Sequence, residues 1–73
     1  MLYLYSTSHC HLCELAFHML TELNLDSVES LEITDNAQLL EEYGLRIPVI
    51  KRVDTGAELN WPFTLNDIKQ FLF

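Results

Sequence analysis

Near the start of the chain a short apolar segment leads into an amphipathic one, and two cysteines lie at the junction. Residues 1–5 are almost entirely apolar and rich in tyrosine, which is typical of a buried strand. Further on, apolar residues recur with the period of one helical face, at Leu12, Leu15, Ala16, Met19, Leu20 and Leu23. The sequence therefore predicts a strand that leads directly into a helix, with Cys10 and Cys13 at the beginning of that helix.

The polar residues Ser6, Thr7 and Ser8 separate these two elements, and we expect their hydroxyl groups to cap the first turn of the helix. Cys10 then lies at the helix N-terminus, where the partial positive charge favours a thiolate. Cys13 lies one turn further along on the same side, within bridging reach of Cys10. This placement indicates thiol–disulfide chemistry, in which Cys10 is the nucleophile and Cys13 resolves the mixed disulfide.

The chain is small and acidic, with 73 residues and a formal net charge of −7. At this length we expect one domain over residues 1–73. The charge argues against nucleic acid and acidic membrane surfaces as partners, and it either serves solubility or steers the protein toward a basic partner. Two cysteines this close together could not staple a secreted domain, and no leader or membrane span stands out. We therefore expect a cytoplasmic protein, and further expect it to be a monomer.

The middle of the chain predicts a strand followed by a helix. The first helix is expected to end near Asn24. Residues 28–34 then alternate between apolar and polar and carry two acidic side chains, which is typical of an edge strand. N-capping residues at positions 34–36 precede a second helix over residues 37–43, and Gly44 occupies the position of a left-handed C-terminal cap.

The last third of the chain predicts a hairpin and a helix. Pro48 lacks an N–H group and so belongs at the entry to a strand over residues 49–53, which a glycine-containing turn joins to residues 57–60. Thr64 and Asp67 resemble a capping box at the start of the final helix. The order β-α-β-α-β-β-α predicts an α/β fold with a mixed four-stranded sheet and helices on both faces, because the first crossover makes the first two strands parallel.

This order of elements resembles the thioredoxin fold in its smallest form, the glutaredoxins, over essentially the whole chain. The residues that carry the resemblance are Cys10 and Cys13 after the first strand and Ile47-Pro48 before the third. The resemblance implies that the peptide bond before Pro48 is cis, that this proline lies against the cysteine pair, and that the backbone of Ile47 is free to pair with an extended substrate. It also implies an oxidoreductase that acts on protein or small-molecule disulfides without a required cofactor.

Several positions depart from the glutaredoxin pattern. His11-Leu12 stands between the cysteines in place of proline and an aromatic residue, Thr7 replaces a basic residue, and Arg46 replaces a threonine. Trp61-Pro62 stands where a glycine pair and an acid usually begin the last helix. Because charged groups that bind both ends of glutathione are missing, we expect weak dependence on glutathione and a better reductant in a dithiol protein such as a thioredoxin.

Other side chains near these markers are candidates for the site. His11, between the cysteines, could stabilise the Cys10 thiolate when protonated, whereas His18 is expected to be a surface residue. Arg46 could bind a substrate carboxylate or be an ordinary loop charge. Trp61 and Phe63 suit core packing better than a substrate groove.

Two other functions remain open from the sequence. One is a redox-silent binding module that keeps the fold and presents Ile47-Pro48 to a partner chain. The other is a metal or iron–sulfur carrier through Cys10 and Cys13, although structural zinc sites normally draw a second ligand pair from a distant segment, and no other cysteine exists in the chain. We therefore predict no metal ligands.

Overall fold

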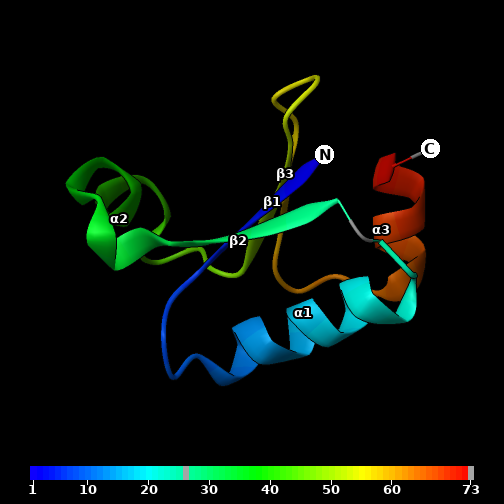
Figure 1. Ribbon diagram of the computed structural model, residues 1–73, viewed down its shortest axis with the longest axis horizontal. Coiled ribbons are helices and arrows are strands. Elements are labelled where there is room, and N and C mark those ends of the chain that lie inside the picture. Colours follow the sequence, from blue (N-terminus) through cyan, green and yellow to red (C-terminus); the bar gives the residue numbers. More distant parts are fainter. Residues whose placement is uncertain (26, 73) are drawn as a thin grey trace.

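The structure is a computed structural model, and it describes residues 1–25 and 27–72. The elements in chain order are β1 (Leu2–Ser6), α1 (His11–Glu22), β2 (Val28–Glu32), a 3-10 turn η1 (Ile33–Asp35), α2 (Ala37–Tyr43), β3 (Val49–Arg52), β4 (Glu58–Asn60) and α3 (Leu65–Leu72) (Figure 1). None of the helices within this described part of the chain is long and apolar enough to cross a membrane.

The four strands form one mixed sheet in the order β2-β1-β3-β4. β1 pairs in parallel with β2 and antiparallel with β3, and β4 is antiparallel to β3. The first pair is parallel because α1 carries the chain back along the sheet between the two strands. The predicted fold class is confirmed, and so is the predicted edge position of the second strand.

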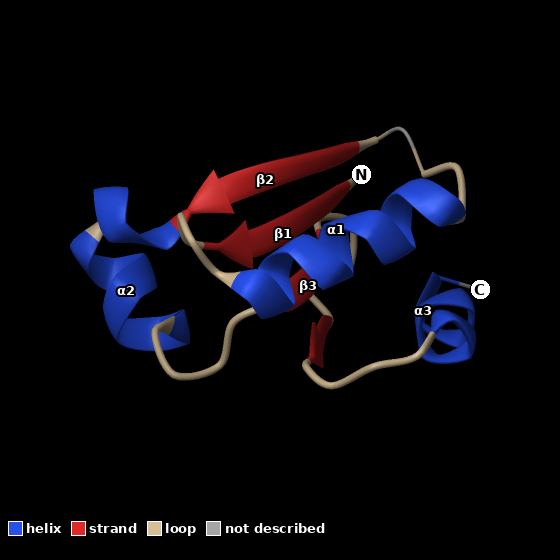
Figure 2. Cartoon of the chain, turned by 90° about the horizontal axis from the view of Figure 1, so that it is seen from below, coloured by secondary structure: helices blue, strands red, loops and turns tan. Residues whose placement is uncertain are grey.

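Each face of the sheet has its own apolar cluster. On one face, α1 and α3 pack against a cluster formed by Leu2, Leu4, Ala16, Leu20, Ile50, Phe63 and Ile68. On the other face, α2 and η1 contribute to a cluster formed by Tyr5, Ile33, Tyr43 and Val49. Figure 2 shows α2 well separated from α1 and α3. The alternation of neighbouring strand residues between the two clusters, such as Leu4 and Tyr5, follows from the two-residue period of a strand.

Capping residues begin α2 and α3 as predicted. Asn36 Oδ1 accepts hydrogen bonds from the N–H groups of Gln38 and Leu39, at 2.9 and 3.1 Å. Thr64 and Asp67 form a reciprocal pair, in which each backbone N–H donates to the other side chain, at 2.8 and 3.1 Å. Caps of this kind satisfy N–H groups that have no partner within the helix, and each contributes about 1 kcal/mol.

Some predicted boundaries are wrong. α1 ends at Glu22 rather than near Asn24, which instead takes a positive φ of 59°. β2 ends at Glu32 because the following residues turn into η1, which buries Ile33 in the second cluster. β3 and β4 are each one residue shorter than predicted, at the hairpin end.

Gly44 does not adopt the predicted left-handed cap. Its φ of −54° and ψ of −32° are right-handed, and its N–H donates to the Leu40 carbonyl oxygen at 2.9 Å. The glycine is needed for space, because a Cβ at this position would collide with that same carbonyl oxygen. The N–H groups of Arg46 and Ile47 both donate to the Tyr43 carbonyl oxygen, so the helix end is satisfied without a left-handed residue.

We expect Gly44→Ala to destabilise the protein, although glycine-to-alanine changes in right-handed backbone usually stabilise. The added Cβ meets a backbone oxygen of Leu40, which cannot rotate away, and overpacking of this kind costs about 1–3 kcal/mol. Urea unfolding measures the change. Glu41→Ala, at an exposed position of the same helix, is the control and should have little effect. A Gly44→Ala protein as stable as the original would contradict this explanation.

Candidate redox site

Cys10 and Cys13 lie at the beginning of α1 and are joined by a disulfide bond, with their Cα atoms 5.2 Å apart. Cys10 is the N-cap residue of α1, in extended backbone with φ −96° and ψ 104°. Cys13 lies inside the first turn and is buried, at 5% exposed, whereas Cys10 is partly exposed. Both cysteines therefore occupy the positions that the sequence predicts, one accessible and one shielded.

The sulfur of Cys10 caps the helix, in place of the hydroxyl groups of Ser6, Thr7 and Ser8 that were predicted to do so. Cys10 Sγ accepts a hydrogen bond from the Cys13 N–H at 3.2 Å. In the reduced protein the same N–H and the positive end of the helix dipole both favour a thiolate on Cys10. The geometry thus supplies a physical difference in reactivity between the two thiols.

Glu32, the last residue of β2, anchors the loop that leads to the disulfide. The Ser8 hydroxyl and the Ser8 N–H both donate to Glu32 Oε1, at 2.8 and 2.9 Å. Hydrogen bonding from the Ser8 hydroxyl lowers the pKa of the Glu32 carboxyl to about 2. This contact could not be predicted from the sequence, because the partners are 24 residues apart and only the register of β1 with β2 brings them together.

The segment before β3 reaches the same end of the sheet as the disulfide. Tyr5 pairs with Val49, so the loop that leaves β1 toward Cys10 and the residues that enter β3 lie at one end. The Ile47–Pro48 peptide bond is cis. The two sequence motifs therefore lie at the same end of the sheet although they are far apart in the chain.

Ile47 and Pro48 offer less to a substrate than the glutaredoxin resemblance implies. The Pro48 side chain is fully buried. The N–H of Ile47 is already used, because it donates to the Tyr43 carbonyl oxygen at 3.1 Å, and the Pro48 carbonyl oxygen accepts the Trp61 N–H at 3.2 Å. In the described part of the chain, the Ile47 carbonyl oxygen has no hydrogen-bond donor. Within the described residues, the carbonyl oxygen of Ile47 is thus without a hydrogen-bond partner, whereas its N–H has one.

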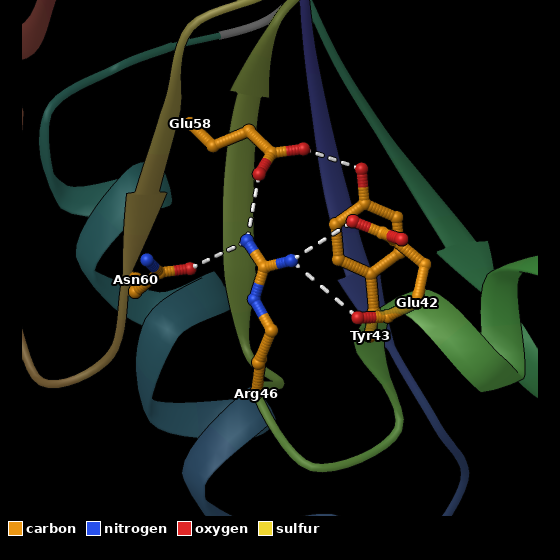
Figure 3. Close-up of polar contacts among 5 residues, drawn as sticks. All are labelled: Glu42, Tyr43, Arg46, Glu58 and Asn60. Carbon is orange, nitrogen blue, oxygen red and sulfur yellow. Dashed lines mark hydrogen bonds and ion pairs between the residues drawn. The ribbon is translucent and has the colours of Figure 1, made fainter.

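Arg46 is held within a polar cluster of side chains from α2 and β4 (Figure 3). Its guanidinium donates to Glu58 Oε1 at 2.7 Å, to Asn60 Oδ1 at 3.1 Å and to Glu42 Oε1 at 3.2 Å. It also lies over the Tyr43 ring, 5.0 Å from the ring centroid. With these acceptors on both terminal nitrogens, the charge of Arg46 is largely satisfied within the protein, so a substrate carboxylate would have to compete for it.

The ionisation of the cluster follows from these contacts. Burial, together with the hydrogen bond that the Tyr43 hydroxyl donates to Glu58, raises the pKa of Tyr43 above its usual range. The same hydrogen bond, followed by the contact with Arg46, lowers the pKa of the Glu58 carboxyl. Arg46 and Glu58 therefore form a neutral pair, and Glu42 adds a negative charge beside them. The only positive charge in this cluster, that of Arg46, is therefore already paired.

The histidines and the aromatic pair are placed as follows. His11 is exposed, and its Nδ1 lies 3.9 Å from Glu14 Oε2. His18 is exposed, as predicted. Phe63 is buried in the first apolar cluster, and Trp61 packs against it edge to face, with the ring centroids 5.0 Å apart. Core packing is therefore the correct interpretation of both aromatic residues.

Metal-ligating side chains do not gather at the cysteine pair. Across residues 1–25 and 27–72, no group of three or more His, Cys, Asp or Glu side chains is arranged to hold a metal ion. A structural zinc site needs four ligands, and Cys10 and Cys13 supply two. A metal or cluster carrier would therefore need further ligands from a second molecule.

We expect Glu32→Gln to flatten the acid part of the stability profile. The folded-state pKa of about 2 lies below the ordinary value of 4.5, so the Glu32 carboxylate stabilises the fold above pH 4.5 and that contribution is lost as the pH falls toward 2. Thermal unfolding followed by circular dichroism across this range measures the effect. Glu29→Gln, an exposed acid on the same strand, is the matched control. An acid profile unchanged by Glu32→Gln would rule out the anchor.

Comparison with known proteins agrees with this geometry. A family model described as Glutaredoxin-like domain (DUF836) matches residues 1–73. The X-ray structure of the Northeast Structural Genomics target protein XcR50 from X. campestris is similar, with a TM-score of 0.90 and 38% identity over 99% of this chain and 95% of that chain. The solution structure of the same target has a TM-score of 0.86 and 38% identity, over 97% and 90% of the two chains. Among curated proteins there is no significant match. The chain belongs to the glutaredoxin-like domain family.

Proposed function

We propose that this protein is a thiol–disulfide oxidoreductase in which Cys10 and Cys13 form the reactive pair. The observation that carries the proposal is the disulfide between an accessible N-cap residue of α1 and a buried residue in the first turn of the same helix. A glutaredoxin-like domain with such a pair supports a redox role. The substrates we propose are protein or small-molecule disulfides.

The reaction in the reducing direction proceeds by two exchanges. The Cys10 thiolate attacks one sulfur of the substrate disulfide, so that a bond between Cys10 and the substrate forms and the other substrate sulfur leaves as a thiolate, which takes up a proton. The Cys13 thiol then gives up its proton and attacks Cys10 Sγ. The first substrate sulfur leaves as a thiol, and the Cys10–Cys13 disulfide forms. Two electrons have passed to the substrate, and a dithiol reductant must return two to complete the cycle.

The surroundings of Cys10 and Cys13 support their different roles as nucleophile and resolving cysteine. Cys10 is partly exposed and its sulfur accepts a hydrogen bond from the Cys13 N–H, whereas Cys13 is buried. His11 is solvent-exposed and directly follows Cys10, and we propose that its protonated form adds to the stabilisation of the thiolate. Through its open carbonyl oxygen, Ile47 can accept one hydrogen bond from an extended substrate.

The same structure argues for a dithiol reductant over glutathione. Glutathione carries two carboxylates and one ammonium group, so it needs charged partners at both ends. Thr7 provides no charge, Arg46 is already engaged by Glu58, and the N–H of Ile47 is occupied. Pro62 has no N–H to offer at the other end.

We expect Cys10 to be the faster-reacting thiol. The Cys13→Ser protein, which keeps Cys10, should be alkylated by iodoacetamide at neutral pH faster than the Cys10→Ser protein, because Cys10 alone combines the helix N-terminus with solvent access. The rates are measured on fully reduced proteins across a range of pH and compared with those of the same proteins unfolded in urea. Faster alkylation of the Cys10→Ser protein would reverse the two roles.

We expect the protein to catalyse reduction of insulin disulfides with dithiothreitol as the dithiol donor. Cys10→Ser should abolish turnover, and Cys13→Ser should accumulate a mixed disulfide that mass spectrometry detects. With glutathione at equal thiol concentration the rate should be lower by roughly tenfold or more, since one lost charge-assisted contact is worth about 1–3 kcal/mol. Equal rates with both donors would contradict the choice of donor. No turnover with either would refute the oxidoreductase and favour the redox-silent binding module.

A further inference from the structure

A groove of about 490 Å³ runs beside the disulfide. Its lining comes from β1, β2, α1 and the loop between β1 and α1, and includes Cys10, Cys13, Glu14, Phe17, His18 and Ser30. Because β2 and β3 flank β1 on opposite sides, the groove reaches the disulfide from the side away from Ile47 and Pro48. It is thus a second approach to the cysteines, separate from the one that the glutaredoxin resemblance implies.

The walls of the groove suit a small or extended polar substrate. Glu14, Phe17 and His18 stand three and four residues apart on α1 and so share one face of the helix. Phe17 is 49% exposed and presents an apolar surface beside the disulfide. On the opposite wall, Ser30 lies beside Leu4 in the parallel pair of β1 and β2, and both residues line the groove.

The Pro48 side of the disulfide is more restricted. The proline ring is fully buried, and the N–H of Ile47 is used within the protein. The guanidinium of Arg46 is held by Glu58, Asn60 and Glu42 (Figure 3). The groove on the β2 side, in contrast, is open to solvent and reaches both cysteines.

The charges of the lining favour a cationic ligand. The groove contains one carboxylate, on Glu14, whose side chain is 69% exposed, and no lysine or arginine. The cationic side chains of the protein lie elsewhere. Arg46 is paired with Glu58, Lys51 and Arg52 lie opposite the first residues of β1, and Lys69 lines a different hollow near the end of α1.

We infer that this groove receives the part of the substrate that becomes bonded to Cys10, and that it selects cationic over anionic disulfides. The inference rests on the proposed oxidoreductase function and adds a substrate class to it. The acidic chain, with a net charge of −7, acts in the same direction by drawing cations toward the site from a distance.

Three small disulfides of similar size test this selectivity: cystamine is a dication, bis(2-hydroxyethyl) disulfide is neutral, and 3,3′-dithiodipropionate is a dianion. Each is mixed with fully reduced protein at pH 8 and low salt, and the formation of the Cys10–Cys13 disulfide is followed by mass spectrometry after acid quenching. Each rate is divided by the rate at which dithiothreitol reduces the same disulfide, so that differences in the intrinsic reactivity of the three disulfides cancel.

We expect the normalised rates to fall in the order dication, neutral, dianion, with roughly a tenfold span that narrows in high salt. Glu14→Gln should lower the ratio of dication to neutral rates by roughly threefold, the size expected for one exposed charge contact. Glu22→Gln removes the same charge from the far end of α1 and should leave the ratio near its original value. Equal rates for the three disulfides, or equal effects of the two variants, would overturn the selectivity.

Blocking the groove tests its location. Ser30→Tyr places a large side chain in the groove from an exposed edge-strand position and should slow oxidation by the neutral disulfide several-fold. Glu29→Tyr adds the same side chain on the other face of β2 and should not. A folded Ser30→Tyr protein that reacts at the original rate would place the substrate elsewhere. If none of the three disulfides oxidises the unmodified protein, the proposed function itself fails, and this inference fails with it.

Discussion

The hydrogen-bonded pairing of β1 on both of its edges is the constraint on which the rest of the structure depends. Its five residues connect the parallel strand β2 to the antiparallel strand β3. The register places Ser6 opposite Glu32 and Tyr5 opposite Val49. One strand end therefore gathers the cysteine loop, the carboxylate that anchors it and the entry to β3. A slip of one residue would move every side chain of β1 to the wrong face and separate these parts.

Two sides of the disulfide differ in how firmly they are held. On the β3 side, hydrogen bonds from Arg46 tie the segment before Pro48 to α2 and to β4, and Tyr43 stacks on Tyr5 beneath it, with ring centroids 4.1 Å apart. On the β2 side, the Ser8–Glu32 contacts hold the loop at one point and leave an open groove beside it. In this small domain, several side-chain contacts hold the β3 side of the disulfide in place, whereas the β2 side is open to solvent.

The features that depend on near neighbours in the sequence could be predicted. The strand-to-helix junction, the N-caps at Asn36 and Thr64, and the buried position of Cys13 all follow from patterns within a few residues. The contacts that could not be predicted join distant segments. Arg46 meets Glu58 twelve residues later, and their pairing requires the register of β3 with β4. Gly44 was misassigned because its signal, a glycine at a helix end, is the same for a left-handed cap and for a position where the carbonyl oxygen of the preceding helical turn leaves no room for a Cβ.

The sulfur that caps α1 makes the stability of the helix depend on oxidation state. In the disulfide, Cys10 Sγ is an uncharged acceptor for the Cys13 N–H. After reduction, a thiolate at the same position accepts that N–H as a charge-assisted bond and interacts with the helix dipole. By thermodynamic linkage, the free energy that the helix gains from a charged cap is the same free energy that favours the dithiol over the disulfide. The Cys13 N–H and the dipole of α1 thus shift the equilibrium between the disulfide and the dithiol toward the dithiol.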